Sequence, residues 1–144
     1  MKIRKACMAD AKAIQRVLFV LRIPDVPWAD WHTMPVIRET IGEGRYYIAE
    51  ESGTIVGAMS VVRHRRMVEI GTLAVRQSFH GLGIGKRLVQ FARFLGKRFA
   101  AKWITVSSLI AYHAKQFYLS VGFRIKSSGL YRGRKWYEFS AVLR

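Results

Sequence analysis

The stretch HGLGIG occupies residues 80–85, and the helix-forming sequence KRLVQFARFLGKRF follows it directly as residues 86–99. The strand-like sequence MVEIGTLAV precedes it as residues 67–75. Glycines between a strand and a helix predict a tight turn whose backbone N–H groups stay uncovered. Such groups at a helix N-terminus, together with the peptide dipoles, favour negative charge. The sequence therefore predicts an anion-binding loop, in particular one for phosphates.

Two common nucleotide-binding motifs do not fit this loop. A Walker A motif needs glycine where His80 stands, and serine or threonine where Arg87 stands. The dinucleotide fingerprint begins correctly at Gly81 and Gly83, but Lys86 occupies the place of its third glycine. Both classes of nucleotide site are excluded on these residues.

The loop resembles the acyl-CoA loop of the GNAT (Gcn5-related N-acetyltransferase) superfamily, whose pattern is Arg/Gln-x-x-Gly-x-Gly/Ala. The corresponding residues are His80, Gly83 and Gly85, so the first position departs from the pattern, although histidine can still donate a hydrogen bond. A second stretch, A-x-x-F-Y-x-x-x-G-F at residues 114–123, is similar to the family's downstream signature. The two motifs follow in the family's order and separation. The resemblance covers nearly all of the chain and is weakest over residues 22–45.

The resemblance implies an α/β fold, the GNAT acyl-CoA N-acyltransferase fold, in which a mixed, mostly antiparallel central sheet carries helices on both faces. It implies acetyl-CoA (coenzyme A) as the cofactor, with the pantetheine arm held by strand backbone and the pyrophosphate by the glycine loop. The implied cofactor-binding residues are Leu73, Ala74, Val75, His80, Gly81, Leu82, Gly83, Ile84, Gly85 and Lys86. An ordinary tight turn is the alternative for the glycines. Ala111 stands where many family members carry a cofactor-contacting asparagine.

The hydrophobic pattern gives the order of the elements, and the length of 144 residues predicts a single domain over residues 1–144. We expect strands at residues 2–6, 46–50, 55–63, 67–75, 103–106, 123–126 and 137–142. We expect helices at residues 34–41, 84–99 and 112–120, and a first helix capped by Asp10 that places Ile14, Val17, Leu18 and Leu21 on one face. Pro24, Pro27 and Pro35 predict a loop-rich segment that contains WADWH at residues 28–32.

Tyr118 is the candidate general acid. It lies where the family often places a proton donor for the departing thiolate, and a phenol with an unperturbed pKa near ~10 is protonated at neutral pH. The alternative is a half-buried aromatic residue that packs on the sheet beside Phe117.

Glu69 is the candidate general base. The sequence V-E-I-G-T-L-A-V resembles a strand of the histone-acetylating branch, in which a glutamate at this position takes that role. Strand alternation places Glu69 on the same face as Leu73 and Val75. The alternative is a structural glutamate paired with Arg65 or Arg66.

Composition excludes several classes of protein. Hydrophobic residues make up 51% of the chain, which excludes disorder, and the single cysteine excludes a disulfide framework. We expect that residue, Cys7, to be small, apolar and buried. The four histidines lack ligand spacing, so no metal site is expected. The chain has neither an apolar run of ~20 residues nor a signal-peptide core, so we expect a cytoplasmic protein without a membrane partner.

The charge is unevenly distributed. The formal net charge is +16, and residues 70–137 hold 13 lysines and arginines without one aspartate or glutamate. This favours an acidic partner, with RNA or DNA bound without sequence preference as the leading candidate; a solvated basic face is the alternative. The expected contacts are Arg87, Arg93, Lys97, Arg98, Lys102, Arg132, Arg134 and Lys135, with Tyr131 and Trp136 stacking on bases.

The predicted function is N-acetyl transfer from acetyl-CoA to a primary amine. We expect direct attack, because Cys7 is remote from both motifs and offers no covalent intermediate. Three classes of acceptor stay open: a protein lysine or N-terminus, a small amine, and an aminoacyl group on tRNA, as in the toxin branch of the family. A small cationic amine could be attracted by the acids Asp25, Asp30, Glu39 and Glu43. A non-catalytic, nucleic-acid-binding module with the same fold is the alternative from another class. The oligomeric state, including a homodimer, is also open.

Overall fold

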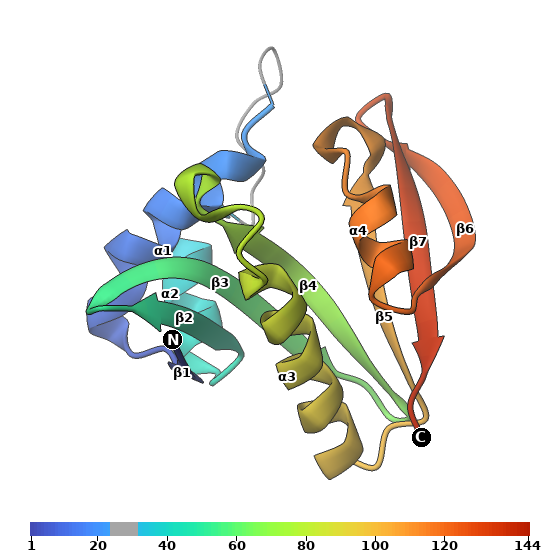
Figure 1. Ribbon diagram of the computed structural model, residues 1–144, viewed down its shortest axis with the longest axis horizontal. Helices are drawn as coiled ribbons and strands as arrows, with labels where there is room; N and C mark the ends of the chain where they lie inside the picture. The colour runs from blue at the N-terminus through green and yellow to red at the C-terminus, as the bar shows by residue number, and fades with distance from the viewer. Residues whose placement is uncertain (24–31) are drawn as a thin grey trace. The chain divides into compact units, whose positions relative to one another are not determined.

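Residues 1–23 and 32–144, the part of the chain that this computed structural model describes, contain seven strands and four α-helices (Figure 1). The strands are β1 (Lys2–Lys5), β2 (Tyr46–Glu51), β3 (Thr54–Arg63), β4 (Met67–Val75), β5 (Trp103–Leu109), β6 (Arg124–Tyr131) and β7 (Arg134–Val142). The helices are α1 (Ala11–Leu18), α2 (Met34–Gly42), α3 (Ile84–Arg98) and α4 (Lys115–Ser120), and the short 3-10 turns are η1 (Met8–Asp10), η2 (Phe19–Leu21), η4 (Gln77–Phe79) and η5 (Ile110–Tyr112).

The strands follow the order β1-β2-β3-β4-β5-β7-β6 in one mixed sheet. The pairs β1–β2, β2–β3, β5–β7 and β6–β7 are antiparallel, and β4 runs parallel to β5. The predicted mixed, mostly antiparallel sheet is therefore confirmed. The expected loop-rich segment with Pro24, Pro27, Asp25, Asp30 and most of WADWH lies outside the described residues.

The chain divides into two compact units. Unit 1 comprises Met1–Val61 and Thr72–Leu88, and unit 2 comprises Val62–Gly71 and Val89–Arg144. The boundaries cut through β3, β4 and α3, so each of these elements contributes residues to both units.

Unit 1 has helices on both faces of its strands. On one face, α1 and α2 bury an apolar cluster that includes Ile14, Leu18, Ile37 and Ile48. The first turn of α3 packs on the other face, so closely that a Cβ added at Gly57 would lie 3.1 Å from Leu88 Cδ1 and 3.3 Å from Ile84 Cγ2. The small residue in β3 thus sets how closely this helix approaches the strand.

The carboxylate of Asp10 has a different role from the predicted helix cap. It accepts two hydrogen bonds from the Arg4 guanidinium, at 2.8 and 3.0 Å, and one from the Cys7 backbone N–H at 2.8 Å. This bidentate pair holds the pKa of Asp10 down to about 2. Cys7 itself is exposed, so the expectation of a buried cysteine was wrong; it lies in the turn that offers its N–H to Asp10, before the buried residues of α1 begin.

Unit 2 carries α4 and the C-terminal part of α3 on one face of its strands. A Cβ added at Gly96 would lie 2.6 Å from Leu143 Cδ1 and 2.9 Å from Val68 Cγ2, so α3 packs here without a side chain between. The Tyr118 ring of α4 packs on Phe139, with the centroids 5.0 Å apart. Val68 and Phe139 therefore define the helix-covered face, and their strand neighbours point to the opposite face.

The last three strands are longer than predicted. The strand β6 extends to Tyr131 and β7 begins at Arg134, so the two meet in a tight hairpin turn at residues 132–133, in which Arg132 and Gly133 have φ values of +48° and +76°. Most of β6 is exposed, so its polar residues give no alternating apolar signal. The last helix also starts later than expected, at Lys115, because η5 occupies Ile110–Tyr112. No helix in residues 1–23 or 32–144 is long and apolar enough to span a membrane.

Candidate functional site

The loop between β4 and α3 exposes its backbone as the sequence predicts. Gly81 and Gly83 have φ values of +79° and +82°, a region that glycine adopts without a steric penalty. A Cβ added at either residue would have no atom within 4 Å, so open space lies beside the loop at both positions. The side chain of Leu82 between them is exposed.

The first turn of α3 supplies unbonded N–H groups. The N–H of Arg87 donates to the Gly83 carbonyl at 3.1 Å, and the N–H groups of Ile84, Gly85 and Lys86 precede this bond, so they have no acceptor within the helix. The Ile84 side chain is buried and fixes the turn to the core, and no acidic residue stands in the first turn. Gly85 lies inside the first turn of α3. These N–H groups can bind an anion together with the helix dipole.

His80 links the loop to the end of β4. Its Nε2 lies 2.6 Å from the Val75 carbonyl oxygen, which can only accept, so the imidazole donates this hydrogen bond. A neutral imidazole then has only an acceptor left at Nδ1. The arginine of the family pattern has several N–H donors. His80 uses its one donor on the chain's own backbone, at the Val75 carbonyl.

The last residues of β4 leave part of their backbone for a ligand. Ala74 is buried, while Leu73 and Val75 are partly exposed. The Val75 carbonyl already accepts from His80, and the next N–H, that of Arg76, donates to the Val56 carbonyl at 2.8 Å. The Arg76 bond shows that even-numbered residues here direct their backbone groups toward β3, so an extended ligand chain along the other edge of the strand would depend on Leu73 and on the N–H of Val75. These residues and the loop all belong to unit 1.

Glu69 pairs with a histidine. Its Oε1 lies 2.9 Å from His64 Nε2, and both side chains stay open to solvent, with 38% and 44% of their surface exposed. The structural alternative that paired Glu69 with Arg65 or Arg66 named the wrong partner. The reason is the tight turn between β3 and β4, where the His64 N–H donates to the Met67 carbonyl at 2.8 Å and returns the histidine toward the start of β4.

The predicted orientation of Glu69 is confirmed. Val68 and Ile70 on either side of it are buried, whereas Glu69 is partly exposed, which is the alternation of a regular strand. Its register partner in β5 is Thr105, which in turn pairs with Ser140 in β7. Glu69 therefore lies on the sheet face opposite Phe139.

Tyr118 packs as a core residue in unit 2. Its side chain is 5% exposed, and its ring lies against Phe117, Phe123 and Phe139 with centroid distances of 5.1, 5.7 and 5.0 Å. Burial raises the pKa of its hydroxyl, so the phenol keeps its proton at neutral pH. Because it rests on Phe139, Tyr118 lies on the face opposite Glu69, and the structure does not bring the two together.

Arg93 has a structural role that the sequence did not reveal. Its Nη2 donates to the Val121 carbonyl at 2.6 Å, and its guanidinium lies over the Phe123 ring at 5.2 Å. It thus closes the C-terminal end of α4, where Gly122 has a φ of +95°. We expected Arg93 to contact nucleic acid, and this engagement argues against that role.

The comparisons with known proteins identify the family. A family model described as an acetyltransferase (GNAT) domain matches residues 42–125, which include the loop, β4 and α4. The chain belongs to this family. The match confirms the predicted family and the predicted class of enzyme, an acetyltransferase. Among the curated proteins, none matches the chain significantly.

Solved GNAT structures share the whole fold at low sequence identity. Ard1 from Thermoplasma volcanium is 17% identical, with a TM-score of 0.85 over 99% of this chain and 97% of its own. An aminoglycoside 6'-N-acetyltransferase complexed with coenzyme A is 14% identical, with a TM-score of 0.82 over 100% and 98%. YncA from Salmonella typhimurium, solved with its cofactor acetyl-CoA, is 21% identical, with a TM-score of 0.78 over 100% and 94%. These similarities confirm the GNAT fold.

Proposed function

We propose that this protein transfers the acetyl group of acetyl-CoA to a primary amine by direct attack of the amine on the thioester. The observation that carries the proposal is the loop at the start of α3. Open space lies beside the loop at Gly81 and Gly83, the first N–H groups of α3 have no acceptor within the helix, and the family to which the chain belongs uses this loop for acyl-CoA.

The residues present suit acetyl-CoA. The N–H groups of Gly83, Ile84 and Gly85 would bind the pyrophosphate, with Lys86 adding positive charge. The backbone of Leu73 and Val75 would hold the pantetheine arm as an added strand. Bound in this way, acetyl-CoA supplies the activated acetyl group.

Two side chains of unit 2 would manage the protons. Glu69 would accept the proton that the acceptor ammonium must lose before attack, directly or through water, while His64 holds its carboxylate. The amine nitrogen then bonds to the acetyl carbon, and the carbon–sulfur bond breaks. Tyr118 would give its proton to the departing sulfur.

The acceptor is a primary amine whose identity we leave as a set of candidates: a protein lysine or N-terminus, a small amine, or an aminoacyl group on tRNA. Of the acids that could attract a small cationic amine, Glu43 already pairs with Arg45 at 2.9 Å, and Glu39 is exposed. The chain's membership in an acetyltransferase family disfavours the non-catalytic alternative.

The experiment is a measurement of free thiol released from acetyl-CoA across a panel of amines. The panel contains lysine-rich and N-terminal peptides, polyamines and aminoacyl-tRNA. We expect one class to release CoA well above the hydrolysis rate without amine. If no class does so, although acetyl-CoA stabilises the fold against heat, the protein binds the coenzyme but is not an acetyltransferase for these amines.

A further inference from the structure

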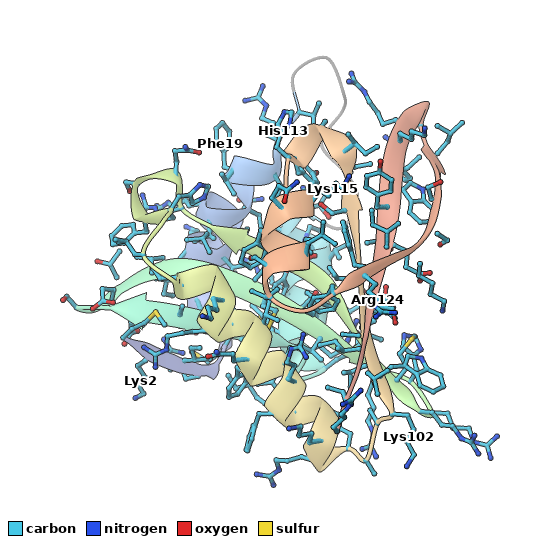
Figure 2. The ribbon with its side chains drawn as sticks, turned by 45° about the vertical axis from the view of Figure 1, so that its right-hand side comes forward. Lys2, Phe19, Lys102, His113, Lys115 and Arg124 are labelled. Atoms are coloured by element: carbon cyan, nitrogen blue, oxygen red, sulfur yellow. The ribbon has the colours of Figure 1, made fainter. Side chains whose placement is uncertain are left out.

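Basic side chains gather at one end of unit 2. The Lys102 N–H donates to the Arg66 carbonyl at 2.7 Å, and the Leu143 N–H donates to the Lys102 carbonyl at 2.8 Å. These bonds join the β3–β4 turn, the loop before β5 and the C-terminus, and the end of α3 adjoins them because the Arg63 guanidinium lies 4.6 Å from the Phe99 ring centroid. Figure 2 shows Lys102 in this region. We call it the basic end; its residues are Arg63, Arg65, Arg66, Lys97, Arg98, Lys102 and Arg144.

The charge of the basic end is not neutralised within unit 2. All seven side chains are exposed, and none forms an ion pair with a described residue. The only acids of unit 2 are Glu69, bonded to His64, and Glu138, which accepts a hydrogen bond from Ser127. Like charges gathered at one end of a unit repel one another. An anionic partner with several charges would relieve that repulsion.

Exposed aromatic residues accompany these cations. Trp103 begins β5 with 38% of its surface exposed, and its register partners are Met67 in β4 and Val142 in β7. Phe94 is 51% exposed, and the Arg98 guanidinium lies 5.7 Å from its ring centroid. By this register Trp103 lies on the sheet face opposite α3, so the cations nearest to it in the chain and across the sheet are Lys102 and those of the β3–β4 turn. A ring beside exposed cations suits single strands, because phosphates meet the cations and a base stacks on the ring.

We propose that the basic end binds single-stranded nucleic acid without sequence preference, with Trp103 stacking on a base. This goes beyond acetyl transfer and does not depend on it, since the coenzyme loop belongs to unit 1 and the basic end to unit 2. It also revises the surface expected from the sequence. Arg134 and Lys135 lie at the other end of β7 from Val142, about 26 Å away at the rise of an extended strand, and are not part of the basic end.

The test is a fluorescence-anisotropy titration of labelled 20-nucleotide oligo(U) and oligo(dT) across salt, carried out both without CoA and with saturating CoA. The triple variant Arg65→Glu, Arg66→Glu, Lys102→Glu removes three cations of the basic end. We expect it to flatten the log–log salt slope by about 2, at roughly 0.7 for each phosphate that is no longer neutralised. A matched control, Lys12→Glu, Arg16→Glu, Arg38→Glu, changes the net charge equally on exposed residues of α1 and α2, and we expect its slope to stay near that of the wild type.

Trp103→Ala separates stacking from charge. We expect affinity for single strands to fall about 5- to 100-fold, the effect of losing one stacked base, with the salt slope unchanged. Should the glutamate triple variant fail to fold, the same three positions changed to alanine give the same comparison with a smaller change in charge.

Four outcomes would overturn the proposal. One is equal weakening by both triple variants, which would mean binding to overall charge. Another is tighter binding of duplex than of single strands, with Trp103→Ala silent. A third is binding of phosphatidylserine vesicles but not of oligonucleotides. The last is displacement of the oligonucleotide by CoA, which would place it in the coenzyme loop.

Discussion

Alanine at Gly83 should weaken acetyl-CoA binding strongly, because the new methyl group covers the backbone of the loop. Gly53, in the β2–β3 turn, provides a matched control. Both glycines have a φ of +82°, and at both an added Cβ would have no atom within 4 Å. A non-glycine residue in this conformation costs about 1–2 kcal/mol. Gly83→Ala and Gly53→Ala should therefore lower the free energy of unfolding by the same amount, which is about 3–10 °C in Tm for a chain of this size.

The ligand should separate the two variants. At acetyl-CoA 100 times above Kd, linkage adds about 2.7 kcal/mol to the stability of the wild type and of Gly53→Ala. In Gly83→Ala the new methyl group stands in the open space beside the phosphate-binding N–H groups. If it weakens binding 100-fold, the same concentration adds only about 0.4 kcal/mol.

Thermal unfolding with and without acetyl-CoA measures both effects, and calorimetric titration measures Kd directly. Equal ligand-induced shifts in Gly83→Ala and Gly53→Ala would refute the assignment of the loop. A wild-type Tm that stays unchanged in millimolar acetyl-CoA would refute coenzyme binding altogether.

Four further outcomes are expected. Tyr118→Phe keeps the ring packing and should lower kcat about 10- to 10,000-fold in the thiol-release assay; wild-type turnover would leave the tyrosine as a packing residue only. Glu69→Gln should lower activity most at low pH, where the acceptor ammonium must still lose its proton. The control His64→Gln retains an N–H donor to Glu69 and should resemble the wild type. A Glu69→Gln pH–rate profile that superimposes on that of the wild type would exclude Glu69 as the base. Gly96→Ala would bring its Cβ to 2.6 Å from a neighbouring methyl carbon and should destabilise by about 1–3 kcal/mol in urea melts. The folded-state pKa of Asp10 is lowered to about 2, so the Asp10 carboxylate stabilises the fold above pH ~4 and this contribution is lost as the pH falls toward 2. Asp10→Asn should lower the free energy of unfolding by about 2 kcal/mol at neutral pH and make it less dependent on pH between ~4 and ~2.

The sequence predicted the features that depend on local backbone chemistry. The glycine loop, the start of α3 and the alternation of β4 follow from rules that act over a few residues, and the structure has all three. The strand β6 was underestimated because an exposed strand needs no apolar alternation. Its length is set by pairing with β7, which the sequence of β6 alone does not encode.

Side-chain partners were less predictable because they depend on turn geometry. Nothing in the sequence distinguishes His64 from Arg65 and Arg66 as the partner of Glu69; the tight β3–β4 turn decides it. The sequence also predicted only part of the distribution of charge on the folded protein. The acid-free span of residues 70–137 contains Arg93, which is used internally at Val121, but it excludes Arg65 and Arg66, which join Lys102 in the folded protein.

The two anion sites use different chemistry, and this separates their salt dependence. The coenzyme loop presents neutral N–H groups and a helix dipole, with Lys86 and Arg87 as the adjacent cations. The basic end presents seven charged side chains and few backbone donors. Binding through released counterions weakens steeply with salt, in proportion to the number of phosphates neutralised, whereas binding through fixed N–H groups at close range depends on salt less. Coenzyme affinity should therefore persist at salt concentrations that abolish binding at the basic end. Most of the net charge of +16 is then unrelated to the coenzyme.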